Sequence, residues 1–342
     1  MLRPFPGAMS RAEQTALPRG AILPAMIRAQ PGPSLRSTTL IGILLAISGS
    51  AIFSINDLAI KALSTGYALH QVILTRSLIS LIFVLGFMSL TGTRLRQLRT
   101  TRLRGHLLRV GFVMLSNIAY FLGLAALPLA DAVAIAFVSP LVVTLLSTLV
   151  LGEQVGPRRW AAVGVGLLGV IVMMRPGAGA LQPAAILVLL SACSYAATHM
   201  MTRRMKDTES AATLNFYVQI GFICVSCTFG LTVGDGHLAG SANPSLAFLF
   251  RPWVWPPMAD WPWFLATGLA VAIGGLMISQ AYRLCAAAVI APFEYAAMPL
   301  AILWGVVIFG QWPDLTAWIG IALICGAGLY TLWRETVIRK RA

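Results

Sequence analysis

Two charged side chains of opposite sign stand inside neighbouring apolar stretches of the sequence. Asp57 lies near the end of the stretch 39–63, and Arg76 lies about two helical turns into the stretch 70–91. If both stretches are helices, a carboxylate and a guanidinium reach a similar depth, where a charge is costly unless it faces a partner or a cavity. The pattern indicates a structural ion pair or a contact to a charged solute, and one residue can serve both roles.

Glu294 is a further acid inside an apolar stretch, two residues after Pro292 and beside Tyr295. Proline has no N–H group to donate, so it frees a main-chain carbonyl group and loosens the helix. Because burial disfavours the charged form of a carboxyl group, an acid at such a bend is suited to carrying a coupling proton. The alternative is a structural role, in which Glu294 braces the end of its helix.

Other polar and aromatic side chains also occur within the apolar stretches. Singly, each could simply bridge two helices, but together they predict a cavity that offers aromatic surface and hydrogen bonds to an amphipathic solute. Besides Asp57, Arg76 and Glu294, the candidate cavity residues are Asn56, Asn117, Tyr120, His199, Gln219, Gln280, Tyr282 and Tyr295.

The composition indicates which kind of fold must position these residues. Of the 342 residues, 58% are hydrophobic and 11% are charged, and the mean hydropathy is +0.82. A soluble domain has about 25% charged residues. The chain is therefore predicted to be an all-α integral membrane protein, with the lipid bilayer as its environment. A net charge of +14 could suggest a nucleic-acid partner, but the basic residues form short clusters between apolar stretches, and no nucleic acid is expected.

Ten apolar stretches follow one another along the chain. Most are close to the ~20 residues that cross a bilayer as a helix, and the absence of hydrogen-bond partners in lipid makes each of them helical. Their approximate spans are 39–63, 70–91, 106–126, 130–151, 159–175, 183–203, 211–233, 261–284, 288–310 and 315–334.

The basic residues predict an orientation. Most of the 25 lysines and arginines fall in the two ends of the chain and in alternate loops, all on one side of the ten stretches. The positive-inside rule places that side, and both termini, in the cytoplasm of a bacterium, with the chain in the inner membrane. Residues 1–37 are then a disordered cytoplasmic tail and residues 336–342 a short basic cytoplasmic tail.

The stretch 119–174 occurs twice in the sequence. The second copy begins near residue 281, and an offset that drifts slowly between 158 and 162 residues is typical of a duplicated unit. The marks that carry it are the pairs Tyr120/Tyr282, Pro140/Pro299, Gly152/Gly310 and Trp160/Trp318. The repeats are predicted to span 38–176 and 182–335. Because five crossings are an odd number, the second copy enters the membrane inverted, as in secondary transporters.

Two familiar motifs can be set aside. Gly164, Gly166 and Gly169 match a dinucleotide-binding pattern, but they lie inside an apolar stretch with no strand before it, so they indicate a helix-packing face. No glycine precedes a lysine, so there is no phosphate-binding loop. No cofactor and no metal is expected. A polytopic membrane enzyme would need a clustered nucleophile or adjacent carboxylates, and a membrane scaffold would not explain Asp57, Arg76 and Glu294.

The chain resembles the drug/metabolite transporter superfamily, in its EamA family, over about residues 38–335. The resemblance rests on the duplicated block, the Leu151-Gly152-Glu153 turn, the Asn56-Asp57-x-x-x-Lys61 element and the segment Ala291 to Tyr295. It implies ten helices in two inverted five-helix repeats that move small organic metabolites by alternating access, with a small-molecule solute and candidate coupling protons as partners. The Asn56-Asp57 and Pro292–Tyr295 elements resemble carriers of S-adenosylmethionine and riboflavin, and aromatic amino-acid exporters are similar too. Gln311 and the long loop 234–260 depart from the pattern, so the solute and its direction, like the oligomeric state, stay open.

Overall fold

The computed structural model describes residues 35–90, 98–151, 156–174, 183–285 and 287–341, and within these ranges the chain is helical without any strand. The predicted all-α fold is therefore confirmed. Residues 1–34, the Gly152-Glu153 part of the repeat turn and most of the loop around Arg96 lie outside the described ranges. The helices are α1 (Leu35–Leu63), α2 (Leu69–Leu90), α3 (Leu103–Ala126), α4 (Leu129–Ala136), α5 (Ser139–Leu151), α6 (Pro157–Met174), α7 (Pro183–Arg204), α8 (Ala211–Val233), α9 (Pro244–Phe250), η3 (Met258–Asp260), α10 (Trp261–Leu284), α11 (Ala287–Ile290), η4 (Ala291–Ala296), α12 (Ala297–Phe309) and α13 (Leu315–Arg341).

Six of these helices are long and apolar enough to cross a membrane, namely α1, α2, α3, α7, α8 and α10. Shorter apolar helices occur at Leu129–Val143, Trp160–Met173, Phe293–Phe309 and Leu315–Tyr330. Large apolar side chains cover the outer surface: Ile82 is 71% exposed and Leu231 is 90% exposed. A helix that is apolar on all sides and not covered by protein is suited to lipid.

Two of the predicted crossings are interrupted in mid-course. The stretch 130–151 divides into α4 and α5 at Phe137 and Val138, directly before Pro140, which has no N–H group for a helix hydrogen bond. The stretch 288–310 divides into α11, the 3-10 segment η4 and α12, with Pro292 inside η4. The bend that the sequence predicted beside Glu294 is thus present, as a tighter helical turn that carries the glutamate.

The two ends of the helical region differ from the predicted tails. α1 begins at Leu35, within the segment predicted as a disordered tail, and α13 continues to Arg341, into the basic tail predicted from residue 336. Neither helix stops at the predicted boundary, because apolar content alone marks where lipid contact ends and not where helical hydrogen bonds end.

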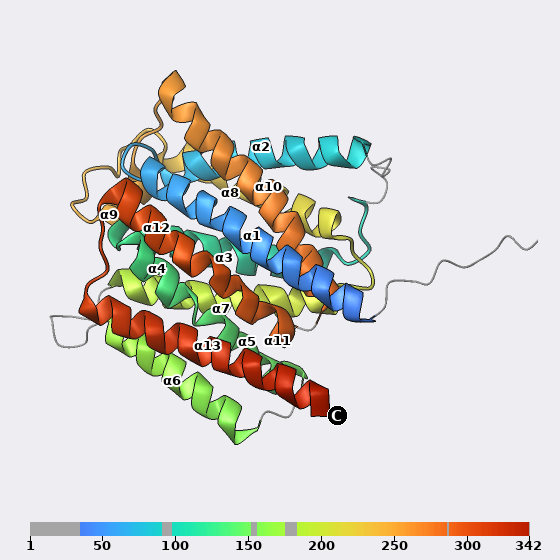
Figure 1. Cartoon of the computed structure of the whole chain (residues 1–342). Coiled ribbons are helices and arrows are strands. Elements are labelled where there is room, and N and C mark those ends of the chain that lie inside the picture. Colours follow the sequence, from blue (N-terminus) through green and yellow to red (C-terminus); the bar gives the residue numbers. More distant parts are fainter. Residues whose placement is uncertain (1–34, 91–97, 152–155, 175–182, 286, 342) are drawn as a thin grey trace, which may run out of the picture.

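Helices far apart in the sequence pack side by side (Figure 1). α1 lies along α10, α3 along α7, α2 beside α8, and α6 beside α13 at one edge of the bundle. Small residues allow these approaches: a Cβ atom at Gly169 of α6 would lie 3.0 Å from the main-chain oxygen of Gly320 in α13. Gly166 also meets neighbours, Leu141 and Ala327, whereas Gly164 faces open space. Two of the three glycines therefore form the predicted packing face.

Candidate functional site

The centre of the bundle encloses a cavity of about 240 Å³. Its wall is formed by α1, α2, α3, α7, α8 and α10 together with the two interrupted helices, so both predicted repeats contribute. Aromatic and apolar side chains make up much of the wall. Of the predicted cavity residues, the wall contains Asn56, Asp57, Arg76, Asn117, Tyr120, His199, Gln219 and Glu294.

Asp57 is held in the cavity wall by two neutral donors. Its Oδ2 atom accepts a hydrogen bond of 2.9 Å from the Tyr120 hydroxyl group, and its Oδ1 atom accepts one of 3.2 Å from Asn56 Nδ2. Asn56 is itself buried. Each oxygen of the carboxylate thus accepts one hydrogen bond, and neither donor carries a positive charge.

Glu294 is held in a similar way in the second half of the chain. Its Oε1 atom accepts a hydrogen bond of 2.5 Å from the hydroxyl group of Tyr282, and its Oε2 atom accepts one of 2.8 Å from Tyr195. Glu294 is buried, with 7% of its surface exposed. Among the described residues Glu294 has two phenol donors and no cation partner, so burial favours its neutral form while the two hydroxyl groups can bond either form, since a hydroxyl can donate or accept.

Each acid takes its hydrogen-bond donors from its own part of the chain. Asn56, Asp57 and Tyr120 all lie within 38–176, and Tyr195, Tyr282 and Glu294 all lie within 182–335. Tyr120 and Tyr282 are also the pair that marks the duplication in the sequence.

His199 is packed between the two tyrosines that bind Glu294. Its ring stacks on Tyr282 with 3.8 Å between centroids and meets Tyr195 edge-on at 4.2 Å. Neither ring nitrogen has a hydrogen-bond partner among the described residues. The imidazole therefore stacks as an aromatic ring and also lines the cavity, so it both packs and faces the cavity.

Arg76 does not form the predicted ion pair with Asp57. The guanidinium lies beside Phe121 and Phe222, with Cζ 5.1 Å from each ring centroid, and its Nη2 atom donates a long hydrogen bond of 3.4 Å to Asn117 Oδ1. Helix depth correctly indicated that Asp57 lies near Arg76, but the two groups form no ion pair. Depth alone could not reveal that neutral donors already occupy the carboxylate.

Three predicted residues lie outside the cavity wall. Tyr282 stands behind it and supports Glu294 and His199. Tyr295 turns away and donates a hydrogen bond of 2.9 Å to the main-chain oxygen of Phe137. Gln280 accepts a hydrogen bond of 2.7 Å from Arg283 Nη1, and its cavity role is not supported by its position. The sequence alone could not show which face of α10 points into the cavity and which face points towards a neighbouring helix.

The sequence analysis missed Arg109, which lines the cavity from α3. Its Nε atom donates to Thr202 Oγ1 at 2.8 Å, and its Nη1 atom donates to the oxygen of Leu214 at 3.1 Å. The signal that singled out Arg76, a charge inside an apolar stretch, applies equally to Arg109 and could have found it. Asn117 also lines the cavity from α3, and its Nδ2 atom donates to Val113 O at 2.9 Å.

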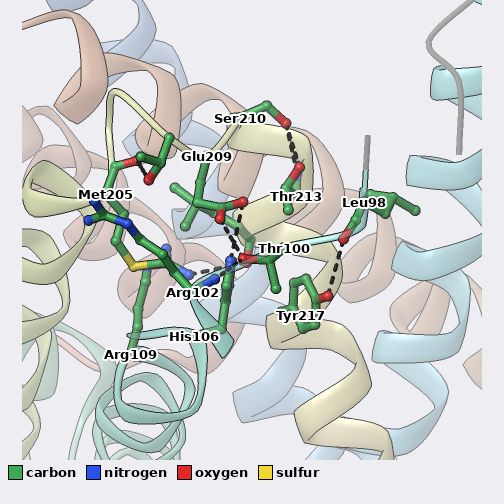
Figure 2. Close-up of polar contacts among 12 residues, drawn as sticks. Leu98, Thr100, Arg102, His106, Arg109, Met205, Glu209, Ser210, Thr213 and Tyr217 are labelled. Atoms are coloured by element: carbon green, nitrogen blue, oxygen red, sulfur yellow. Dashed lines mark hydrogen bonds and ion pairs between the residues drawn. The ribbon is translucent and has the colours of Figure 1, made fainter. Parts of the chain in front are cut away.

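A second polar cluster joins the two parts of the chain at one end of the bundle (Figure 2). Glu209, which is buried, accepts a hydrogen bond of 2.5 Å from Thr100 Oγ1 and lies 3.3 Å from His106 Nε2. The His106 ring packs on Tyr217 with 4.2 Å between centroids, and the Tyr217 hydroxyl donates to the oxygen of Leu98 at 3.1 Å. This cluster connects the approach to α3 with the beginning of α8.

Long-range bonds also join the chain at the other end. Arg251 Nη1 donates to the main-chain oxygen of Ser64 at 2.8 Å, and the Tyr67 hydroxyl donates to Asp260. Gln71 Nε2 donates to the oxygen of Val254 at 2.6 Å. The segment that precedes α10 therefore lies across the α1–α2 connection. In the described part of the chain, no group of three His, Cys, Asp or Glu side chains could hold a metal ion.

Comparison with known proteins agrees with this architecture. The profile of the EamA-like transporter family matches residues 40–175. A riboflavin transporter of Rhizobium johnstonii is 32% identical over 254 residues, which cover 74% of this chain and 78% of that protein. The chain belongs to the EamA-like transporter family. It is accordingly a multi-span membrane protein of a bacterial transporter family.

Two further similarities extend across most of this EamA-like chain. An S-adenosylmethionine uptake transporter of Rickettsia prowazekii is 24% identical over 82% of the chain and 89% of its own length. A solved crystal structure superposes with a TM-score of 0.63 at 23% identity and covers 87% of this chain and 98% of the other. The structural likeness establishes the fold, including the parts beyond the 40–175 match.

Proposed function

We propose that the protein is a secondary transporter that moves a small amphipathic organic metabolite across the bacterial inner membrane by alternating access. The observation that carries the proposal is the central cavity, which both parts of the chain enclose and which holds Asp57, Arg76 and Glu294 among aromatic rings. Charged groups inside a membrane protein are retained where they face a solute pathway or one another. Relatives are named as transporters of riboflavin and of S-adenosylmethionine, which supports these or similar compounds as solutes; amino acids are included in the proposal as solutes of similar size.

The packing of the helices supports two inverted repeats of five crossings. In this assignment α1, α2, α3, α4–α5 and α6 correspond to α7, α8, α10, α11–α12 and α13. Exchange of the two repeats converts the α1–α10 contact into the α7–α3 contact, and both are present. It converts the α2–α8 and α6–α13 contacts into themselves. Such a pattern is expected if a two-fold axis in the membrane plane relates the repeats.

The distribution of basic residues supports a cytoplasmic location for both termini. Arg339, Lys340 and Arg341 lie near the C-terminus, and Arg203 and Arg204 end α7 on what would be the same side. The cluster around Glu209 would then lie at the cytoplasmic end and the Arg251 contacts at the outer end. Alternating access requires these contacts to break and form in turn as the repeats rock against each other.

Glu294 is the proposed proton carrier. It lies in an interrupted helix at the cavity wall, and its two partners are hydroxyl groups, so a proton can be gained or lost without separating an ion pair. A transporter of this kind could load a proton on one side and release it on the other. No enzymatic role is proposed, because the relatives are named as transporters.

Reconstitution in liposomes tests the function. Purified protein should accumulate at least one solute from a panel of riboflavin, S-adenosylmethionine and the aromatic amino acids, and counterflow should follow from preloading with the same solute. Thr228→Val provides a matched control, because Thr228 is exposed on α8 and bonds only to its own helix, at Cys224 O. Chemical conversion of a panel compound without its movement would instead support a membrane enzyme, and no activity of either kind would contradict the proposal.

A further inference from the structure

Arg76 has weaker hydrogen bonding to the protein than three other cations within the helical bundle. Lys61 Nζ donates to the oxygens of Leu124 and Leu127 at 2.9 and 2.6 Å. Arg109 has bonds of 2.8 and 3.1 Å, and Arg203 donates to Cys285 O at 2.6 Å. Arg76, with 1% of its surface exposed, has a single bond of 3.4 Å.

The remaining donors of Arg76 are unpaired. In the described part of the structure, Nε and Nη1 have no hydrogen-bond partner. The nearest acid, Asp57, is already bonded by Asn56 and Tyr120, and no ion pair reaches Arg76. A buried guanidinium without compensation is strongly unfavourable, so its retention in the cavity wall indicates a partner that the protein does not itself provide.

The surroundings of Arg76 define the chemistry of that partner. Phe121 and Phe222 each have a ring centroid 5.1 Å from Cζ, within cation–π range, while Nε and Nη1 at the edge of the guanidinium have no partner among the described residues. A planar carboxylate matches the edge of a guanidinium, and an anion would displace the long bond to the Asn117 amide with little loss. Asn117 lines the cavity, so a solute in the cavity reaches this position.

We propose that Arg76 is the carboxylate subsite of the solute cavity, with Phe121 and Phe222 as the clamp that orients the guanidinium. This inference rests on the proposed function, and it narrows the solute to a compound with a carboxylate group beside an aromatic or apolar part. The Glu294 carboxylate lies elsewhere in the same wall, between Tyr195 and Tyr282, so a positively charged group on the solute would be accommodated there.

Thermal unfolding of the purified protein in nanodiscs tests the subsite with benzoate and benzamide as probes. The two compounds have the same shape and differ in charge. Benzoate about tenfold above its dissociation constant should raise the unfolding midpoint by a few degrees, at constant ionic strength with chloride as the balancing anion. Benzamide should require at least about tenfold higher concentration for the same shift, since it lacks the charge that a guanidinium binds.

Two variants test whether the benzoate-induced shift in the unfolding midpoint depends on Arg76. Arg76→Gln should abolish the benzoate shift, and Arg203→Gln, the removal of an arginine that lies outside the cavity wall and donates to Cys285 O, should keep it. Equal shifts by benzoate and benzamide, no benzoate shift, or a benzoate shift that persists in Arg76→Gln would each overturn the proposal. The comparison of probes on the unaltered protein decides the question even if Arg76→Gln does not fold.

The outcome separates the subsite from the transport function. Benzoate binding that depends on Arg76, without accumulation of any panel solute in liposomes, would contradict the proposed transporter and keep the subsite. Transport without Arg76-dependent benzoate binding would contradict the subsite alone.

Discussion

The hydroxyl group of Tyr295 donates a hydrogen bond of 2.9 Å to the main-chain oxygen of Phe137, and the two rings lie 5.0 Å apart. Phe137 stands where α4 gives way to α5, and Tyr295 lies in η4, between α11 and α12. The two interrupted helices thus meet at their interruptions. A carbonyl group freed by one helix break is satisfied by a side chain from the other, which makes both breaks less costly.

Tyr295→Phe should lower stability, because the mutation leaves the Phe137 oxygen without this donor. The expected loss is about 0.5–1.5 kcal/mol, seen as a lower unfolding midpoint in nanodiscs. Tyr330→Phe is the matched control, since Tyr330 is exposed on α13. An equal decrease in both variants would show that the contact is not specific.

Gly328→Ala should also destabilise the protein, because its Cβ atom would overlap the Tyr295 ring.

Glu294→Gln should abolish pH-driven accumulation and keep solute exchange. The amide resembles the protonated acid and retains acceptor and donor atoms for Tyr195 and Tyr282. Exchange needs no net proton movement, so it should continue at a rate within a fewfold of the parent. Asp235→Asn controls for charge removal, because Asp235 is exposed in the loop. Accumulation under a pH gradient equal to that of the parent would assign Glu294 a structural role only.

Asp57 should be coupled to Tyr120 more strongly than to Arg76. The structure shows a hydrogen bond in the first pair and no ion pair in the second. In double-mutant cycles on unfolding free energy, Asp57→Asn with Tyr120→Phe should give an interaction of about 1–3 kcal/mol. The cycle with Arg76→Gln should give less. A larger value for Arg76 would mean that the ion pair forms in the membrane after all.

Cysteine labelling should reveal the proposed orientation. In a cysteine-free background, cysteine at Gly66 or Ala239 should react with an impermeant reagent added from the periplasm, and cysteine at Asp207 should react only after the membrane is opened. All three positions are exposed, so access through the bilayer is the difference that the reagent reports. The reverse pattern would contradict two inverted repeats with cytoplasmic termini.

The hydroxyl group of Tyr67, in the connection between α1 and α2, should lose its proton at a higher pH than an ordinary tyrosine. Burial, and then the hydrogen bond to Asp260, raise the pKa of Tyr67 to about 12 from the usual 10. The folded state therefore binds this proton more tightly than the unfolded state, and the associated stability is complete below pH 10 and lost as the pH rises towards 12. In a spectrophotometric titration, Tyr67→Phe should show one tyrosine fewer among those that ionise above the usual pKa. Asp260→Asn should lower the pKa, and an unchanged curve would exclude the contact.

The sequence predicted the helices better than the site. Apolar length predicts a helix reliably because lipid leaves no other way to satisfy the main chain, and the spans agree with the structure within a few residues at most ends. Pro292 likewise predicted the helix interruption beside Glu294. The partners of the charged groups depend on a rotation about each helix axis, and a shift of one residue turns a side chain by about 100°. For this reason Gln280 was assigned to the cavity, and Arg76 was paired with an acid that Tyr120 and Asn56 already bind.

Because each acid carries its own donors, a rocking motion between the two repeats would leave both local bond networks intact. Asp57 travels with Asn56 and Tyr120, and Glu294 travels with Tyr195 and Tyr282. If the two parts of the chain rock against each other as proposed, the hydrogen-bond donors of each carboxyl group would move with it, and little reorganisation energy would accompany the motion at either acid. The separation between the two carboxyl groups and the dielectric around them would change, so the motion itself would tune how readily a proton leaves.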